Sequence, residues 1–516
     1  MSSLGGVLNR NIFNDGKINH TLLSLQITKN DKMIRKRKES EHMSSLFRKK
    51  DINDLVKHAS PLKRTLKTWD LTFLGIGAII GTGIFVLTGK GALTAGPALA
   101  LSFFMAAICC GFAGLCYAEF ASMAPVAGSA YTYSYIAFGE IIAFIIGWDL
   151  ILEYALGAAT VSVGWSGYFV NLLSNMGIRI PTLLTAAIGT TPGVNTIFNL
   201  PAFLIVLVIT WIISIGITQT KRVNDTMVLV KLAVIVLFII CTIWFIKPQN
   251  WHPFSPFGWY SYHNGTASGI IPAASIVFFS FIGFDAVSSS AEETINPSKT
   301  LPRGILLSLL ISTILYIIMT LTMTGVVKYT IFIKYLNAPI LAFLAKTGQA
   351  WLSIIVSVGA ILGMTTVILV QLYGQSRISY SMSRDGLFPK FFGQVDQKHQ
   401  TPFKGTWFFG IITALASGFI NLNILSELVN IGTLTAFILV SAGVLLMRRT
   451  HPEIHRCFRA PGVPITPIIA IIFCITLIAG LNWETWLRFV VWLAIGMAIY
   501  FGYGRRHATI KDKKGE

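Results

Sequence analysis

Twelve long apolar segments dominate this 516-residue chain. Most of them are long enough to cross a hydrocarbon core about 30 Å thick as α-helices. Charged residues make up 12% of the chain, about half of their usual share in a soluble domain. We therefore expect an all-α polytopic membrane protein. The segments cover roughly residues 70–92, 97–123, 139–171, 200–218, 224–246, 268–291, 303–327, 350–382, 404–421, 424–447, 464–481 and 486–504.

Basic residues are distributed unevenly between the two sides of this predicted bundle. With the N-terminus inside, 33 of the 41 Lys and Arg residues fall in cytoplasmic tails and loops, and seven fall in outer loops. Because basic loops stay on the cytoplasmic side, we expect a multi-pass protein of the cytoplasmic membrane with both termini in the cytoplasm. The net charge of +19 then reflects topology, and no nucleic-acid partner is expected. Residues 1–68 are predicted to form a mostly disordered basic tail, and residues 505–516 a shorter one.

Four glycines lie close together in the first apolar segment, between Gly75 and Gly83. Glycine disfavours a helix by about 1 kcal/mol relative to alanine. A backbone amide left free in hydrocarbon costs several kcal/mol unless it lines a cavity or finds a partner. The stretch therefore either packs tightly against another helix or opens to hold a polar group. Gly75 and Gly77 are the better candidates for packing, and Gly81 to Gly83 for an opening.

The sixth segment has a glycine of its own, Gly283, in the middle of the span. Segments one and six are five apart, as expected for two five-helix repeats of opposite topology. A pair of glycine-interrupted segments at matching positions indicates a binding site near the middle of the membrane. This correspondence favours an opening over simple packing.

Five of the ionisable side chains in the apolar segments qualify as functional candidates, at Glu119, Asp149, Glu153, Lys231 and Asp285. Such residues are candidates for function because isolated charges are costly in a membrane. Glu119 has a second interpretation, as the interfacial partner of a loop cation. Lys231 could extend its ammonium towards the surface, or hold a fixed charge against backbone carbonyls of an opened helix.

Several stretches resemble known transporters. Gly75–Phe85, Tyr117–Tyr133 and Trp148–Gly167 resemble the amino acid–polyamine–organocation superfamily. Lys231 and the motifs Phe281–Asp285 and Ser383–Pro389 are similar to bacterial members of the cationic amino acid transporter family. The resemblance covers roughly residues 45–505. It implies a LeuT-like fold with inverted repeats at about 70–246 and 268–447, unwound first and sixth helices, and two extra helices at about 464–504.

The resemblance also implies a binding mode for an amino acid. The α-carboxylate would meet free amides around Gly81, Thr82 and Gly83, at the positive end of a half-helix. The α-ammonium would meet carbonyls near Ile79 and from the sixth span around Phe279 and Ile282.

Other residues would complete the site or the coupling machinery. Phe279 would be an aromatic gate, and Glu153, Gly157 and Met364 would form the wall and floor. Lys231 would stand in for a sodium ion. Glu153 and Asp285 would be the candidate proton carriers, because buried carboxyl groups can load and release protons near neutral pH.

The predicted function is a secondary active amino-acid permease that works by alternating access, coupled to protons and independent of sodium. Apolar neighbours at Phe279, Ile282 and Met364 favour a neutral or broad range of substrates, whereas Glu153 favours the alternative of arginine and lysine.

The remote alternatives are a transport-dead nutrient sensor and a membrane enzyme. The sequence has no metal-ligand cluster, nucleophile elbow or P-loop, so neither enzymatic activity nor a cofactor or metal is expected. The expected partners are an amino acid, a proton and the lipid bilayer, and the presence of a small membrane subunit is left open.

Overall fold

The computed structural model describes residues 47–50, 65–124, 129–190, 195–216, 221–263, 266–290, 294–336, 338–343, 348, 350–396, 398–399 and 401–508. The chain divides into two units, residues 1–48 with 512–516, and residues 49–511. Phe47 and Arg48 are the described residues of the first unit, and all other described residues belong to the second. Most of the predicted tails, residues 1–46, 51–64 and 509–516, lies outside the described residues.

Helices account for nearly all regular structure in the described residues. The first half of the chain contains α3 (Thr68–Ile79), η1 (Gly83–Leu87), α4 (Thr88–Ala95), η2 (Gly96–Ala98), α5 (Leu99–Met123), α6 (Ser129–Ala137), α7 (Glu140–Asn175), η3 (Thr182–Leu184), α8 (Leu200–Ser214), α9 (Lys221–Thr242), η4 (Ile243–Phe245) and η5 (Pro248–Trp251). The strands β1 (Ser261–His263) and β2 (Thr266–Ser268) pair antiparallel. The second half contains α10 (Ile270–Val277), η6 (Phe278–Phe281), α11 (Ala286–Ser289), α12 (Pro297–Val326), η8 (Tyr329–Lys334), α14 (Ala350–Arg384), η9 (Lys390–Gly393), α15 (Phe403–Phe419), α16 (Leu422–Thr450), α17 (Ile465–Ala479), α18 (Trp483–Ile499), η10 (Tyr500–Gly504) and α19 (Arg505–His507).

Seven helical stretches of the described chain are long and apolar enough to cross a membrane. They are Gly83–Met123, Glu140–Asn175, Asp225–Phe245, Pro297–Val326, Trp351–Arg384, Leu422–Thr450 and Trp483–His507. Shorter apolar helices include α3, α8 and α17. The chain is therefore a multi-pass membrane protein, as the apolar pattern predicted. The count of twelve spans stays a prediction.

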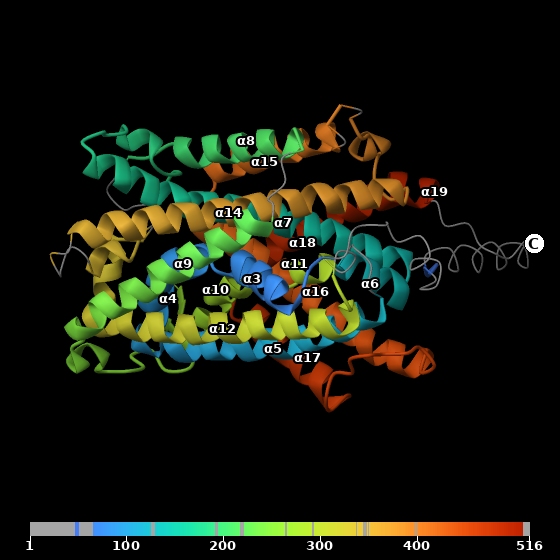
Figure 1. Ribbon diagram of the computed structural model, residues 1–516, viewed down its shortest axis with the longest axis horizontal. Helices are drawn as coiled ribbons and strands as arrows, with labels where there is room; N and C mark the ends of the chain where they lie inside the picture. Colours follow the sequence, from blue (N-terminus) through green and yellow to red (C-terminus); the bar gives the residue numbers. More distant parts are fainter. Residues whose placement is uncertain are drawn as a thin grey trace, which may run out of the picture. The chain divides into compact units, whose positions relative to one another are not determined.

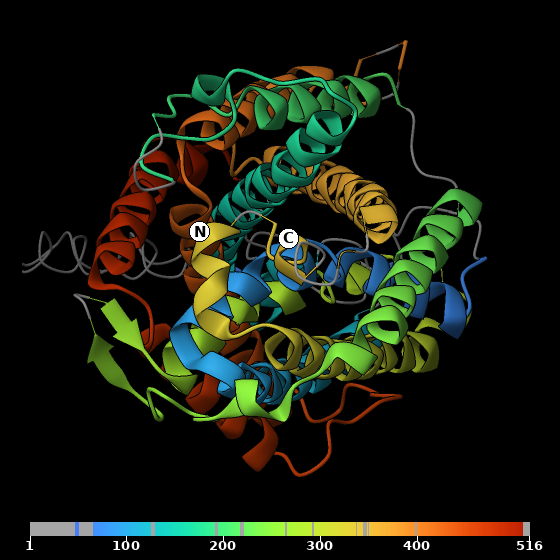
Figure 2. The ribbon, with the colours of Figure 1, turned by 90° about the vertical axis from the view of Figure 1, so that its left-hand side faces the viewer.

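Long helices enclose the short ones that lie between them. Figure 1 shows α3, α10 and α11 between the long helices α14 and α12. The same long helices are seen end-on in Figure 2, and α7 packs closely against both α14 and α16. Large apolar side chains that point away from the bundle, such as Leu204 and Trp211 on α8, are exposed and would face lipid.

The first helix is interrupted where the glycine cluster predicted an opening. Helix α3 ends at Ile79, and Ile80 is extended, with φ −79° and ψ 102°. The chain resumes as a π-helical turn at Gly83. Gly75 lies within α3 at a close contact with α12, because a Cβ there would lie 2.5 Å from Ser308 Oγ. Packing and opening are thus both present, at opposite ends of the cluster.

A second interruption lies opposite the first. Helix α10 tightens into the 3-10 turn η6, and Ile282 is extended before α11 begins. Gly283 has φ +115°, and a Cβ there would lie 3.0 Å from the carbonyl oxygen of Ala78. Only a residue without a side chain fits this close approach between the two broken segments.

Candidate functional site

A pocket lies between the two interruptions. It contains about 240 Å³ of space, including the part that is open to solvent. The described residues around it include no charged side chain. The lining residues are Ala78, Ile79, Gly81, Thr82, Gly83, Val161, Phe279, Ile282, Val367 and Gln371.

The structure places most of the predicted substrate-binding residues at this pocket. Ile79, Gly81, Thr82, Gly83, Phe279 and Ile282 line it. Met364 lies just behind it on α14, where its sulfur accepts a hydrogen bond from Thr82 Oγ1 at 3.5 Å. Gly157 on α7 lies against Gln371, and Glu153 lies one turn earlier on α7, outside the lining.

Lys231 on α9 holds the end of α3. Its Nζ donates hydrogen bonds to the carbonyl oxygens of Gly77 at 2.7 Å and Ile80 at 3.1 Å, and the side chain has 0% exposure. The last carbonyls of a helix lack partners within it, so the ammonium satisfies groups that the interruption leaves free. The interpretation in which Lys231 extends towards the surface is therefore wrong.

Tyr316 on α12 connects the two interruptions. Its hydroxyl lies 3.0 Å from the carbonyl oxygen of Ile79 and 2.7 Å from that of Ser280, and can donate its proton to either. Nothing in the sequence marks this residue as functional, because a tyrosine in an apolar helix resembles an ordinary packing residue. Val161, Val367 and Gln371 were missed for a related reason, since nothing in an apolar helix marks which face meets the pocket.

Three buried acids gather beside the pocket without lining it. Glu153 and Asp285 are 2% and 1% exposed and lie close enough to interact electrostatically, and Asp149 is a further neighbour of Glu153. Tyr154 donates a hydrogen bond to Asp285 Oδ2 at 3.1 Å. Glu153 Oε1 has no hydrogen-bond partner among the described residues.

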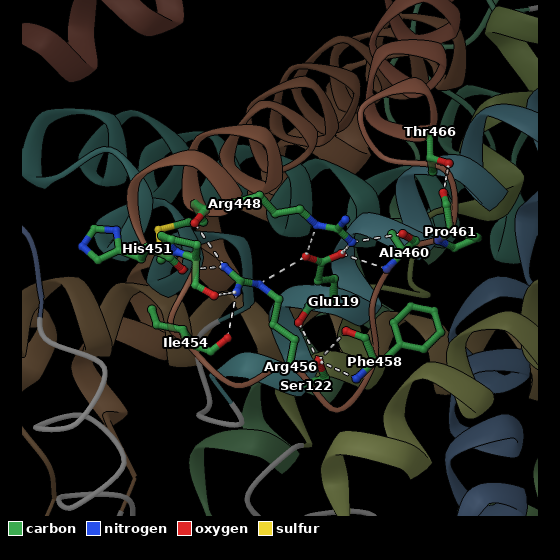
Figure 3. A network of polar contacts seen from close by, with 12 residues as sticks. Glu119, Ser122, Arg448, His451, Ile454, Arg456, Phe458, Ala460, Pro461 and Thr466 are labelled. Atoms are coloured by element: carbon green, nitrogen blue, oxygen red, sulfur yellow. Dashed lines mark hydrogen bonds and ion pairs between the residues drawn. The ribbon is translucent and has the colours of Figure 1, made fainter.

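Glu119 belongs to a separate ionic network, shown in Figure 3. It accepts hydrogen bonds from Arg448 Nε and Nη2 at 2.9 and 2.7 Å, and from the Ala460 backbone amide at 2.8 Å. Arg456 Nε lies 3.4 Å from the same carboxylate. Burial lowers the pKa of the Arg456 guanidinium, and the Glu119 carboxylate opposes that shift. Glu119 is therefore the partner of a cation in the last turn of α16 and of one in the connection to α17, and it joins both to α5.

A second ionic contact joins the chain before α3 to the end of α14. Lys50 Nζ lies 2.5 Å from Asp385 Oδ2, which also accepts a hydrogen bond from the Tyr131 hydroxyl at 2.6 Å. The Lys50 ammonium also lies over the Tyr135 ring, 4.8 Å from its centroid. On α4, Lys90 lies 3.5 Å from Glu427 of α16. Ion pairs thus join the chain before α3 to the residue that follows α14, and α4 to α16.

Comparison with known proteins adds independent evidence. Residues 66–502 match the family described as amino acid permease. The branched-chain amino acid permease BcaP of Bacillus subtilis (strain 168) is 53% identical over 471 residues, which cover 91% of this chain and 99% of the relative. The methylthioribose transporter of the same organism is 48% identical, with 91% and 100% covered. The chloroplastic cationic amino acid transporter 9 of Arabidopsis thaliana is 34% identical, with 87% and 89% covered.

Proposed function

Because this chain belongs to the amino acid permease family, we propose that it moves neutral amino acids across the cytoplasmic membrane by alternating access. The observation that carries this proposal is the uncharged pocket between the broken helices. Backbone amides and carbonyls at the breaks suit the two charged ends of an amino acid, and the apolar wall suits a neutral side chain. The similarity to a branched-chain amino acid permease supports the same substrate class.

The position of Glu153 weakens the alternative of a cationic substrate. This carboxyl group is buried on α7 outside the pocket lining, so it is not placed to pair with a cationic side chain in the present arrangement. The more distant similarity to cationic amino acid transporters gives this alternative less support. The sensor and enzyme alternatives gain none from relatives that are named as transporters.

We propose that transport is coupled to protons and independent of sodium. Lys231 Nζ donates hydrogen bonds to the carbonyl oxygens of Gly77 and Ile80 at the break, where a sodium ion would otherwise be coordinated. Glu153 and Asp285 are the proposed proton carriers, since they are buried, adjacent and next to the pocket. The twelve-span, inverted-repeat architecture with both termini in the cytoplasm is part of the same proposal, and the two facing interruptions support it.

The test is uptake of labelled valine into proteoliposomes with and without a proton gradient, in sodium-free and sodium buffers. We expect uptake that the proton gradient increases and that sodium leaves unchanged. Unlabelled leucine, arginine and methylthioribose are then added as competitors. Competition by leucine alone supports the proposal. Competition by arginine alone would show that the substrate is a cationic amino acid. Competition by methylthioribose alone would show that the substrate is of the methylthioribose class.

A further inference from the structure

One side chain in the pocket wall differs in chemistry from its neighbours. Gln371 on α14 lines the pocket beside Val161, Val367 and Ile282, and it is 4% exposed. Its amide oxygen is buried and has no hydrogen-bond partner among the described residues. A buried acceptor without a partner is costly, and a bound ligand or water is one way in which that cost is met.

The amide of Gln371 packs against Gly157 on α7. Gly157 presents bare backbone to it, and a Cβ at that position would lie 3.3 Å from Gln371 Nε2. The same Cβ would lie 3.7 Å from Oε1, so the whole amide group lies against α7, and Oε1 is its buried atom without a hydrogen-bond partner among the described residues. The oxygen is the atom left to accept a hydrogen bond.

Gln371 is also separated from the broken backbone of the first segment. Val367, one turn earlier on α14, is the residue that faces Gly81. One helical turn corresponds to about 5.4 Å, so Gln371 lies beyond the amides proposed to bind the substrate carboxylate. This position suits the substrate's side chain better than its carboxylate.

We propose that Gln371 is a specificity-determining residue whose amide oxygen accepts a hydrogen bond from a hydroxyl on the substrate side chain. The inference rests on the proposed function and narrows the substrate class to neutral amino acids that include hydroxylated ones. Threonine and valine have nearly the same shape and differ by a hydroxyl in place of a methyl group. Valine leaves the amide oxygen unpaired when it fills the pocket, whereas threonine can pair with it. A site built to hydrogen-bond a hydroxyl discriminates against the analogue that lacks one.

The experiment compares threonine and valine as competitors for uptake of labelled valine in wild type and Gln371→Leu. We expect the ratio of their half-inhibitory concentrations to shift by about fivefold in favour of valine, which is the effect of one hydrogen bond of typical strength. The control is Gln375→Leu. Gln375 lies one turn further along α14, is 1% exposed and is outside the pocket lining, so its substitution should keep the wild-type ratio.

Three outcomes would overturn the assignment. An unchanged ratio in Gln371→Leu means that water alone satisfies the amide. An equal loss of affinity for both amino acids means that Gln371 binds the backbone that they share. A matching shift in Gln375→Leu means that the effect is not specific to the pocket. If Gln371→Leu fails to insert, Gln371→Met gives the same comparison with an unbranched side chain. Failure of the proposed function is distinct from these outcomes, because the wild-type protein would then take up no labelled valine.

Discussion

The ammonium of Lys231 lies 2.7 Å from the carbonyl oxygen of Gly77, in the last turn of the helix that breaks at the pocket. A buried cation from α9 thus holds a carbonyl of α3, across 154 residues of sequence. Without the Lys231 side chain, the carbonyl groups of Gly77 and Ile80 would need a different partner, such as another cation or a water molecule. The contact links the shape of the broken helix to one titratable side chain.

Replacing Lys231 by alanine should abolish uptake while the protein still inserts into the membrane. The substitution leaves two carbonyl groups unpaired in an apolar interior and removes the group that positions the break. We expect gradient-driven valine uptake to fall by at least about tenfold in proteoliposomes, which corresponds to a loss of about 1.4 kcal/mol. Lys247→Ala, at an exposed lysine beyond the end of α9, is the matched control. Undiminished uptake by Lys231→Ala would show that the ammonium has no part in transport.

Replacing Gly83 by valine should remove substrate binding. A Cβ at this position would collide with the Ser280 side chain and lie 2.6 Å from Ser280 Cα, so the two broken segments could not approach as they do. Binding of labelled valine to purified protein is the measurement, with gel filtration as the test of folding. Gly111→Val on α5 is the control, because a Cβ there meets nothing within 4 Å. Wild-type affinity in Gly83→Val would leave this glycine with a packing role only.

The sequence predicted the two interruptions because their chemistry is local. Glycines in an apolar segment are costly, and Gly283 has a backbone conformation that other residues rarely adopt. By contrast, Tyr316 and Gln371 act through partners that are far away in the sequence. The identity of a residue in an apolar helix does not indicate which neighbouring helix it faces. The roles of Tyr316 and Gln371 could therefore be recognised only from the packing of α12 and α14 around the breaks.

Glu119 illustrates the same limit for charged residues. Its place near the end of an apolar segment allowed either a transport role or an interfacial ion pair. The structure favours the ion pair, because the connection between α16 and α17 brings Arg456 and the Ala460 amide to the Glu119 carboxylate. No spacing within α5 could have indicated these partners.

Glu119→Gln should destabilise the protein more than a surface substitution of the same kind. Glu119 and Arg456 are 2% and 4% exposed in their side chains, and neutralising the carboxylate leaves buried positive charge without compensation. Breaking such a pair costs about 3 kcal/mol. The melting temperature of detergent-solubilised protein should therefore fall clearly below that of Glu484→Gln, whose pair with Arg488 is 56% and 37% exposed. Equal melting temperatures would show that the network contributes no stability.

Asp385→Asn should make the pocket open more often towards the side where the chain enters α3. The substitution removes the charge that pairs with Lys50 but keeps an acceptor for the Tyr131 hydroxyl. If that ion pair helps to close this side, its loss should raise the open population by about fivefold, the effect of about 1 kcal/mol. The measurement is the rate at which a membrane-impermeant thiol reagent labels Val367→Cys in inside-out vesicles. Cys241 and Cys457 are replaced by serine in this variant because they are not buried, whereas the other native cysteines are buried and can stay. Asp396→Asn, in the connection that follows α14, is the control. Faster labelling from the opposite side, or an unchanged rate, would show that the contact between Lys50 and Asp385 does not control access to the pocket.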